Sequence, residues 1–159
     1  MRVGSGLDVH SFADGIPLWL GGVHIPHPRG LAGHSDGDAA THALIDALLG
    51  AAARGDIGEW FSSTDEHWRG ARSVDLLRHV WTSLESDGWR LENADLTIVA
   101  AEPRLASYRV QMQAALAESL GCSTARISVK ATTTDGLGAV GRAEGILASA
   151  VALLARDAD

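Results

Sequence analysis

The sequence predicts an α+β protein in which helices cover a β-sheet. Apolar residues recur at three- and four-residue spacing in segments 38–53 and 73–87, which indicates amphipathic helices. The runs LTIVAA (96–101) and RISVKATTT (126–134) are instead typical of strands. Glycines separate these segments, with neither an internal repeat nor a linker between them. We therefore expect residues 1–159 to form a single domain.

The N-terminal half supplies two extended segments and then a helix. Segment 2–10 is predicted to be a strand that carries glycines. In segment 17–26, two apolar runs flank a Gly-Gly pair, which is typical of a β-hairpin. The helix predicted over 38–53 aligns four apolar residues on one stripe, Leu44, Ala47, Leu48 and Ala51. Gly55 and Gly58 then interrupt the chain.

The C-terminal half contains two more predicted helices, 73–87 and 105–120, which end at Gly88 and Gly121. The last segment, AEGILASAVALLA (143–155), is ambiguous. Its alanines favour a helix, whereas the alternation of Ile146, Ala148, Ala150 and Ala152 also fits a strand buried on both faces. Periodicity does not decide between the two for an apolar run of this length.

Composition excludes several classes of protein. The formal net charge is −7 and no Lys/Arg cluster outlines a phosphate-tracking face, so we expect no nucleic-acid partner. The longest apolar run, ILASAVALLA, is too short to span a bilayer, and MRVGSGLDVH lacks the apolar core of a secretory signal. These features predict a cytoplasmic protein with no membrane partner. Cys122 is the single cysteine, which excludes an intrachain disulfide and a cysteine-based zinc site.

Two short stretches predict a metal site. In Leu7-Asp8-Val9-His10, Asp8 and His10 are two residues apart and point to the same side of a strand. In HSDGDAATH (34–42), His42 lies in the first turns of the predicted helix. If the strand packs against this helix, the carboxylate and both imidazoles converge as an open three-ligand site, which suits zinc or manganese.

Other functions for these residues remain open on sequence grounds. A lone D-x-H pattern is usually not a metal site, and Asp36 or Asp38 could simply cap the helix. Asp38 or Asp46 could also orient the His42 ring without itself binding the metal ion. The remaining histidines have no partner at ligand spacing and are interpreted as surface or core residues: His24, His27, His67 and His79.

Two further stretches are candidates for binding a phosphorylated ligand. KATTTDGLGAVGRAEG (130–145) joins a threonine-rich strand to a glycine-rich loop and contains Arg142 as a cation. GDIGEWFSSTD (55–65) is an acidic loop in which Asp56 could bind hydroxyl groups, or it could merely connect two elements. Neither pattern is specific by itself.

The motifs together resemble one family. GLDVHSF, GGVHIP, GLAGHSDGDAATHALIDALLGAAARGDIG, VKATTTD and GRAEGI occur in the order and spacing of 2-C-methyl-D-erythritol 2,4-cyclodiphosphate synthases. The resemblance extends from Met1 to about residue 156. It implies a small mixed sheet with helices on one side, and a strand at 143–155. It also implies a homotrimer with active sites between subunits. The implied reaction is a cyclase step of the non-mevalonate isoprenoid pathway, in which 4-diphosphocytidyl-2-C-methyl-D-erythritol 2-phosphate yields the cyclic diphosphate and CMP.

The resemblance also implies residue roles. Asp8, His10 and His42 would hold Zn²⁺ or Mn²⁺, and Asp135 would hold a Mg²⁺ or Mn²⁺ ion that bridges the substrate diphosphate. His34 and Thr133 would be catalytic. The substrate-binding residues would be Ser35, Asp56, Gly58, Phe61, Ser62, Ser63, Thr64 and Asp65, with Arg142 as a further candidate. The nucleotide-binding residues would be Ala100, Ala101, Glu102, Pro103, Arg104, Leu105, Ala106 and Thr132.

The chain departs from the family pattern in two of these motifs. It has TTTD where the family usually has TTTE, so the side chain of Asp135 is one methylene shorter than the usual glutamate. AAEPR replaces AQAPK, which introduces Glu102. Two other functions are weighed against the cyclase. A zinc-dependent phosphohydrolase would use the same ligands but release linear phosphates. A non-catalytic trimer would bind isoprenoid diphosphates without turning them over.

Overall fold

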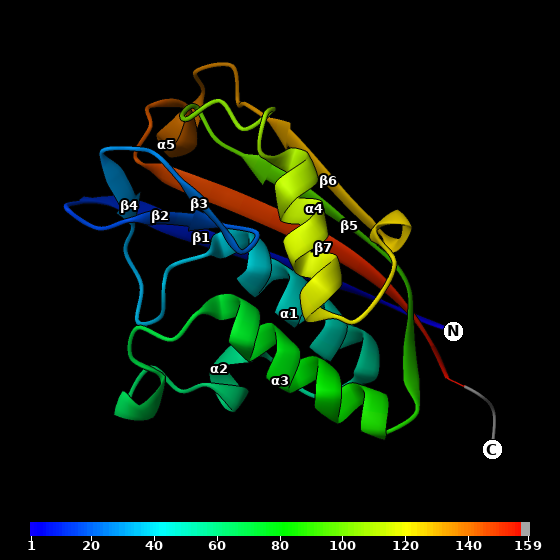
Figure 1. Ribbon diagram of the computed structural model, residues 1–159. Coiled ribbons are helices and arrows are strands. Elements are labelled where there is room, and N and C mark those ends of the chain that lie inside the picture. Colours follow the sequence, from blue (N-terminus) through cyan, green and yellow to red (C-terminus); the bar gives the residue numbers. More distant parts are fainter. Residues whose placement is uncertain (157–159) are drawn as a thin grey trace.

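The computed structural model describes residues 1–156 and has the predicted α+β architecture (Figure 1). Its main sheet has the strand order β4-β1-β7-β5-β6, and β5 and β6 form its one parallel pair. The strands are β1 (Arg2–Asp14), β4 (Arg29–Leu31), β5 (Trp89–Val99), β6 (Ile127–Thr132) and β7 (Gly145–Arg156). The strand predicted over 2–10 is present as β1, which extends four residues further. The strand predicted to begin at Leu96 is present as β5, which begins seven residues earlier.

Helices cover one face of this sheet (Figure 1). The three long ones are α1 (Ala39–Ala52), α3 (Ser73–Ser86) and α4 (Arg109–Ser119), all in segments where the sequence predicts helices. The hairpin is also present, as β2 (Leu18–Leu20) and β3 (Val23–Ile25). The short helical turns are α2 (Ile57–Trp60), η1 (Glu66–Trp68), η2 (Thr124–Arg126) and α5 (Gly138–Gly141).

Close contact between β1 and α1 depends on small residues. A Cβ atom added to Gly4 would lie 2.1 Å from the Ala47 carbonyl oxygen, and one added to Gly6 would lie 2.0 Å from that of Ala43. Any side chain larger than hydrogen at these two positions would push α1 away from β1. The glycines therefore bring the helix that carries His42 directly onto the strand that carries Asp8 and His10.

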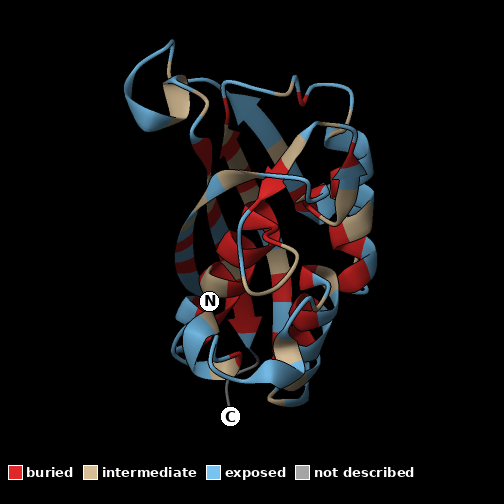
Figure 2. Ribbon diagram, turned by 90° about the vertical axis from the view of Figure 1, so that its left-hand side faces the viewer, coloured by how far each residue is buried: buried red, intermediate tan, exposed pale blue. Residues whose placement is uncertain are grey.

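The ambiguous last segment is a strand, as the family resemblance implies. β7 lies between β1 and β5, so its backbone groups find partners on both edges. Its alternate residues Ile146, Ala148, Ala150, Ala152 and Leu154 are buried. Buried residues gather between the sheet and its helices (Figure 2).

Within residues 1–156, no helix covers the other face of the sheet (Figure 1), and several apolar side chains are exposed there. They are Val3, Leu7, Val9 and Val151, with exposed fractions of 68%, 62%, 55% and 45%. Adjacent exposed apolar side chains of this kind are typical of an interaction surface. In residues 1–156 we find no helix with the length and apolar character needed to cross a membrane.

Candidate metal centre and active site

The predicted metal ligands converge. Asp8 and His10 project from β1, and His42 projects from the first turn of α1. Asp8 Oδ2 lies 2.9 Å from His10 Nε2 and 3.0 Å from His42 Nδ1. The two imidazole nitrogens are 3.2 Å apart. One carboxylate oxygen and two ring nitrogens thus form a compact group that could hold a metal ion.

The hydrogen bonding of His10 supports this function. Its Nδ1 lies 2.5 Å from the carbonyl oxygen of Ala32. A carbonyl oxygen only accepts, so Nδ1 carries a proton and donates to it, and Nε2 is the His10 atom that could bind a metal ion. Nε2 faces Asp8 Oδ2, and a divalent ion bound there would take the place of the proton that they share. The donor atoms therefore fit a divalent metal ion, and the carbonyl of Ala32 fixes the ring orientation.

The charges at the site also favour a cation. Burial raises the pKa of Asp8, but hydrogen bonds and attraction from His10 and His42 outweigh it and hold the pKa well below its usual range. The hydrogen bond with Asp8 raises the pKa of His10, against the opposing effect of burial. Asp8 is therefore ionised at neutral pH, and the site attracts positive charge.

Asp38 has a structural role at the start of α1. It is fully buried, and its carboxylate accepts hydrogen bonds from Thr41 N at 3.0 Å and Thr41 Oγ1 at 2.7 Å. The same carboxylate accepts from Gly21 N and Gly22 N at 2.8 and 2.7 Å, which ties the hairpin to the helix. The prediction that Asp38 or Asp46 orients His42 is wrong, because Asp46 instead accepts from Ile57 N at 2.8 Å.

The atoms that hold His42 belong to two serines. Its Nε2 lies 2.8 Å from Ser73 Oγ and 3.0 Å from Ser35 Oγ. Ser73 is the first residue of α3 and is fully buried. Nothing in the sequence indicates this contact, because Ser73 lies 31 residues from His42 and a serine at the start of a helix is usually a capping residue.

A pocket of about 340 Å³ opens beside the metal ligands. The predicted residues His34, Ser35, Gly58, Phe61, Ser62 and Ser63 line it together with Asp8, His10 and His42. Three lining residues were not predicted, namely Ile57, Trp68 and Leu76. They add apolar side chains to the pocket lining, and only the packing of the 57–68 segment against α3 could have revealed them.

Three residues of the predicted substrate loop do not line this pocket in the chain as it stands: Asp56, Thr64 and Asp65. Asp56 caps α2 by accepting from Glu59 N at 3.0 Å, and Asp65 caps η1 by accepting from His67 N at 2.9 Å. The carbonyl oxygen of Asp65 also lies 3.1 Å from His34 Nε2. His34 is therefore hydrogen-bonded to the 61–65 loop.

The predicted nucleotide-binding residues form a second pocket, of about 270 Å³. It is lined by Ala100, Ala101, Pro103, Arg104, Leu105, Ala106, Ala131, Thr132 and Thr133. Thr133, predicted to act together with His34, is thus in a different pocket of the same chain. Glu102 is not in the lining; its carboxylate accepts a 2.6 Å hydrogen bond from Arg29, which lowers its pKa.

Asp135 and Arg142 lie outside both pockets. Asp135 has a left-handed backbone conformation, with φ of 54°, and its amide donates to Thr133 Oγ1 at 3.1 Å. This turn connects Asp135 to the second pocket through Thr133. Arg142 pairs with Glu144 at 2.7 Å on the exposed side of the last turn before β7.

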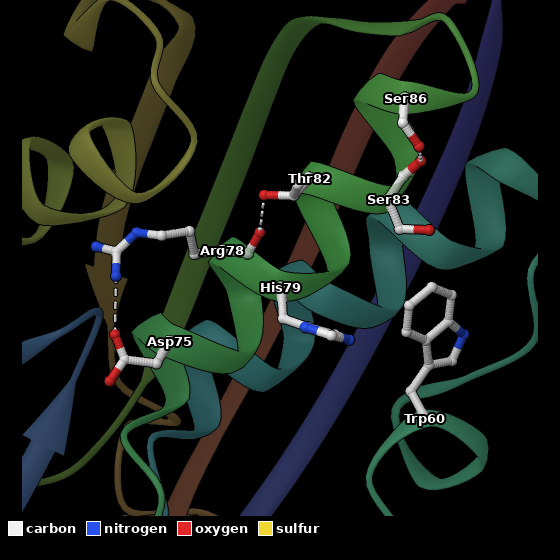
Figure 3. Close-up of a pocket in the computed structure, with 7 residues that line it drawn as sticks. All are labelled: Trp60, Asp75, Arg78, His79, Thr82, Ser83 and Ser86. Atoms are coloured by element: carbon white, nitrogen blue, oxygen red, sulfur yellow. Dashed lines mark hydrogen bonds and ion pairs between the residues drawn. The ribbon is translucent and has the colours of Figure 1, made fainter.

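The outer face of α3 has another hollow, of about 570 Å³, in which Trp60 and His79 face one another (Figure 3). Thr82 and Ser86 there already donate to carbonyl oxygens of their own helix. The imidazole of His79 contacts the rings of Trp60, Phe61 and Trp68, with centroid separations of 6.2, 5.8 and 6.1 Å. His79 therefore packs against the rings of the predicted substrate loop.

The fold and the site define a metal-capable α+β protein with a polar pocket, and the chain belongs to the YgbB family, whose model matches residues 1–155. It is 53% identical over 154 residues to the 2-C-methyl-D-erythritol 2,4-cyclodiphosphate synthase of Cronobacter sakazakii, and the match covers 97% of each chain. The enzyme of the same name from Alcanivorax borkumensis is also 53% identical, over 97% of this chain and 96% of the relative.

Solved structures show the same likeness. A 2C-methyl-D-erythritol-2,4-cyclodiphosphate synthase in a CDP-bound form matches with a TM-score of 0.88 and 40% identity, over 97% of this chain and all of the other. The bifunctional IspDF of Campylobacter jejuni matches with a TM-score of 0.94 and 41% identity. That match covers 98% of this chain and 42% of the longer protein.

Proposed function

We propose that this chain catalyses the cyclisation of 4-diphosphocytidyl-2-C-methyl-D-erythritol 2-phosphate to 2-C-methyl-D-erythritol 2,4-cyclodiphosphate, with release of CMP. The observation that carries the proposal is the convergence of Asp8, His10 and His42 on one wall of a polar pocket. Membership of the YgbB family and 53% identity to enzymes of this name support it.

The proposed metal ions follow from the donor atoms. Zinc, or else manganese, fits the two nitrogens and one oxygen of the Asp8 site. Asp135 is proposed to hold a magnesium or manganese ion shared with the substrate diphosphate. Bound there, these ions would neutralise the phosphate charges that a chain of net charge −7 otherwise repels.

The protein needs no nucleophile of its own for this reaction. An oxygen of the substrate's 2-phosphate attacks the phosphorus next to the methylerythritol unit. One P–O bond forms, and the P–O bond to CMP breaks. The role of the chain is to fold the substrate so that these groups meet. We assign Ser35, Gly58, Ser62 and Ser63 to the methylerythritol phosphate portion, since they line the pocket beside the metal ligands.

His34 and Thr133 are proposed to hydrogen-bond the phosphate oxygens while charge shifts towards CMP. The backbone carbonyl of Asp65 accepts from His34 Nε2 in the free chain, so this N–H is available to an incoming phosphate once the loop moves. Asp56, Phe61, Thr64, Asp65 and Arg142 complete the proposed substrate set. Residues 100–106 with Thr132 are assigned to the cytidine, in the second pocket.

A homotrimer is part of the proposal. The two pockets of one chain have no lining residue in common, although one substrate molecule must occupy both kinds of site. A neighbouring subunit that contributes its second pocket to the metal pocket would complete the site. The exposed apolar residues of the uncovered sheet face would be buried in such an assembly.

The test is a phosphorus NMR time course with the cytidine diphosphate substrate, zinc and magnesium. Two coupled resonances of a cyclic diphosphate, appearing together with CMP, are expected. Linear phosphates would instead identify a phosphohydrolase. Absence of turnover in protein that contains stoichiometric zinc would contradict both enzymatic functions and favour a regulatory trimer that binds isoprenoid diphosphates.

A further inference from the structure

A buried chain of hydrogen bonds leads from Asp36 through Ser73 to His42. The Ser73 hydroxyl is hydrogen-bonded to Asp36 Oδ1 and lies 2.8 Å from His42 Nε2. Ser73 is fully buried, and the side chain of Asp36 is 7% exposed. The chain joins three separate segments, namely the loop before α1, α1 itself and the first residue of α3.

The partners of Asp36 give this chain a direction. Its Oδ2 accepts from Ser73 N at 3.0 Å and faces the guanidinium of Arg72 at 3.8 Å. Its Oδ1 accepts from Asp38 N at 3.3 Å as well as from the Ser73 hydroxyl. An ionised carboxylate only accepts, so the single hydroxyl proton of Ser73 is donated to Asp36. Ser73 Oγ can then only accept from His42, so His42 carries a proton on Nε2, and a metal ion can take Nδ1 in place of the Asp8 hydrogen bond.

We propose that Asp36 and Ser73 are positioning residues that keep His42 in the tautomer whose Nδ1 is free to bind the metal ion. His42 Nδ1 is the atom that faces Asp8 Oδ2 and His10 Nε2. Asp36 and Ser73 thus do for His42 what the Ala32 carbonyl does for His10. The inference rests on the proposed metal site but not on the cyclase reaction.

Ser35 has a related but different position. Its hydroxyl is 3.0 Å from the same Nε2, yet it lines the open pocket and also accepts weakly from Gly37 N at 3.4 Å. No carboxylate is bonded to it to fix the direction of its proton, so it can turn towards a ligand. Ser73, locked by Asp36, is the residue that selects the tautomer.

Two variants test the proposal in different ways. Ser73→Ala removes the buried acceptor and leaves Ser35 as the partner of His42 Nε2. Asp36→Asn has one acceptor oxygen in place of two, and its amide can donate to Ser73. The hydroxyl proton is then released towards His42 Nε2, so the bonding reverses and the proton moves to Nδ1. Asp36→Asn is therefore expected to have the larger effect. Ser119→Ala is the matched control, a buried serine bonded only to its own helix, at Ala115 O.

The first measurement is nitrogen NMR of His42 in the metal-free protein at mildly alkaline pH. Burial and the nearby Asp38 raise the pKa of Asp36, and this pH keeps the carboxylate ionised. For this measurement all proteins carry Asp8→Ala, because the Asp8 carboxylate would otherwise accept from His42 Nδ1 in the metal-free protein. In this background, the parent protein and Ser119→Ala are expected to carry the proton on Nε2, whereas both test variants lose this preference. The second measurement is zinc affinity by chelator competition, in which the test variants are expected to bind about 10- to 100-fold more weakly.

Unchanged tautomer populations and unchanged zinc affinity in folded Ser73→Ala would overturn the proposal. Circular dichroism establishes folding, and Ser73→Ala alone decides the question if Asp36→Asn does not fold. A wild type that binds no zinc would contradict the proposed metal site. The tautomer measurement on the metal-free protein would still decide the roles of Ser73 and Asp36 in that case.

Discussion

Gly6 of β1 lies directly beneath the carbonyl oxygen of Ala43 in α1, so close that a Cβ atom would be 2.0 Å from it. This contact sets the distance between the strand that carries two predicted metal ligands and the helix that carries the third. The glycine is therefore part of the architecture of the site, although it contacts no ligand.

Gly6→Ala is expected to lower stability by about 1–3 kcal/mol, because the helix must move off the strand. Zinc affinity should fall at the same time, since His42 moves with α1. Gly50→Ala is the control. Gly50 is exposed in the same helix, and its added Cβ would have only the Ser5 carbonyl oxygen near it, at 3.8 Å. Gly50→Ala should raise the free energy of unfolding by roughly 0.5–1 kcal/mol, because alanine favours the helix more than glycine does. Urea unfolding measures both, and equal destabilisation by the two substitutions would contradict the close-packing argument.

Asp8→Ala is expected to abolish zinc binding while leaving the fold and the oligomeric state unchanged. A bound metal ion contributes several kcal/mol to transition-state charge stabilisation, so turnover should fall roughly 100-fold or more. Removal of metal from the wild type with a chelator should give the same loss, and added zinc should restore only the wild type. Metal analysis and the phosphorus NMR assay measure the two effects. Full turnover by metal-free Asp8→Ala would exclude a role for this site in the reaction.

The rings around His79 are expected to hold the substrate loop against α3. Phe61 and Trp68 line the metal pocket, pack edge-to-face with a centroid distance of 4.8 Å, and both contact His79 from behind. His79→Ala should cost about 1 kcal/mol of stability and raise KM several-fold with a smaller change in kcat. His79→Phe should retain most of the wild-type KM. Thr82→Ala, on the same face of α3, is the control. A KM unchanged by His79→Ala would show that the loop is positioned without these contacts.

Asp135→Glu is expected to lower the magnesium concentration needed for half-maximal activity. The longer carboxylate can reach the ion directly, whereas Asp135 is expected to reach it through water. The measurement is a magnesium titration of turnover at fixed zinc. Superimposable titration curves for the two proteins would refute the prediction.

Local sequence was sufficient for most of the fold and for the three residues that could hold a metal ion. The two-residue period of a strand puts Asp8 and His10 on one side, and the glycines of β1 are visible as a pattern. The helices also follow from their apolar periodicity. Boundaries were less accurate, since β5 begins seven residues before the predicted strand. Its first residues, from Trp89, are held by pairing with the end of β7, which is a tertiary contact.

Only the tertiary structure decided the features that depend on contacts between distant segments. The run 143–155 is compatible with helix or strand by composition, and it is a strand because β1 and β5 supply hydrogen-bond partners on both edges. Asp36 and Ser73 are 37 residues apart, and nothing local to either indicates that together they hold His42. Local periodicity determines which way a side chain points within its own element. Which groups it meets depends on how the elements pack, and that depends on the whole chain.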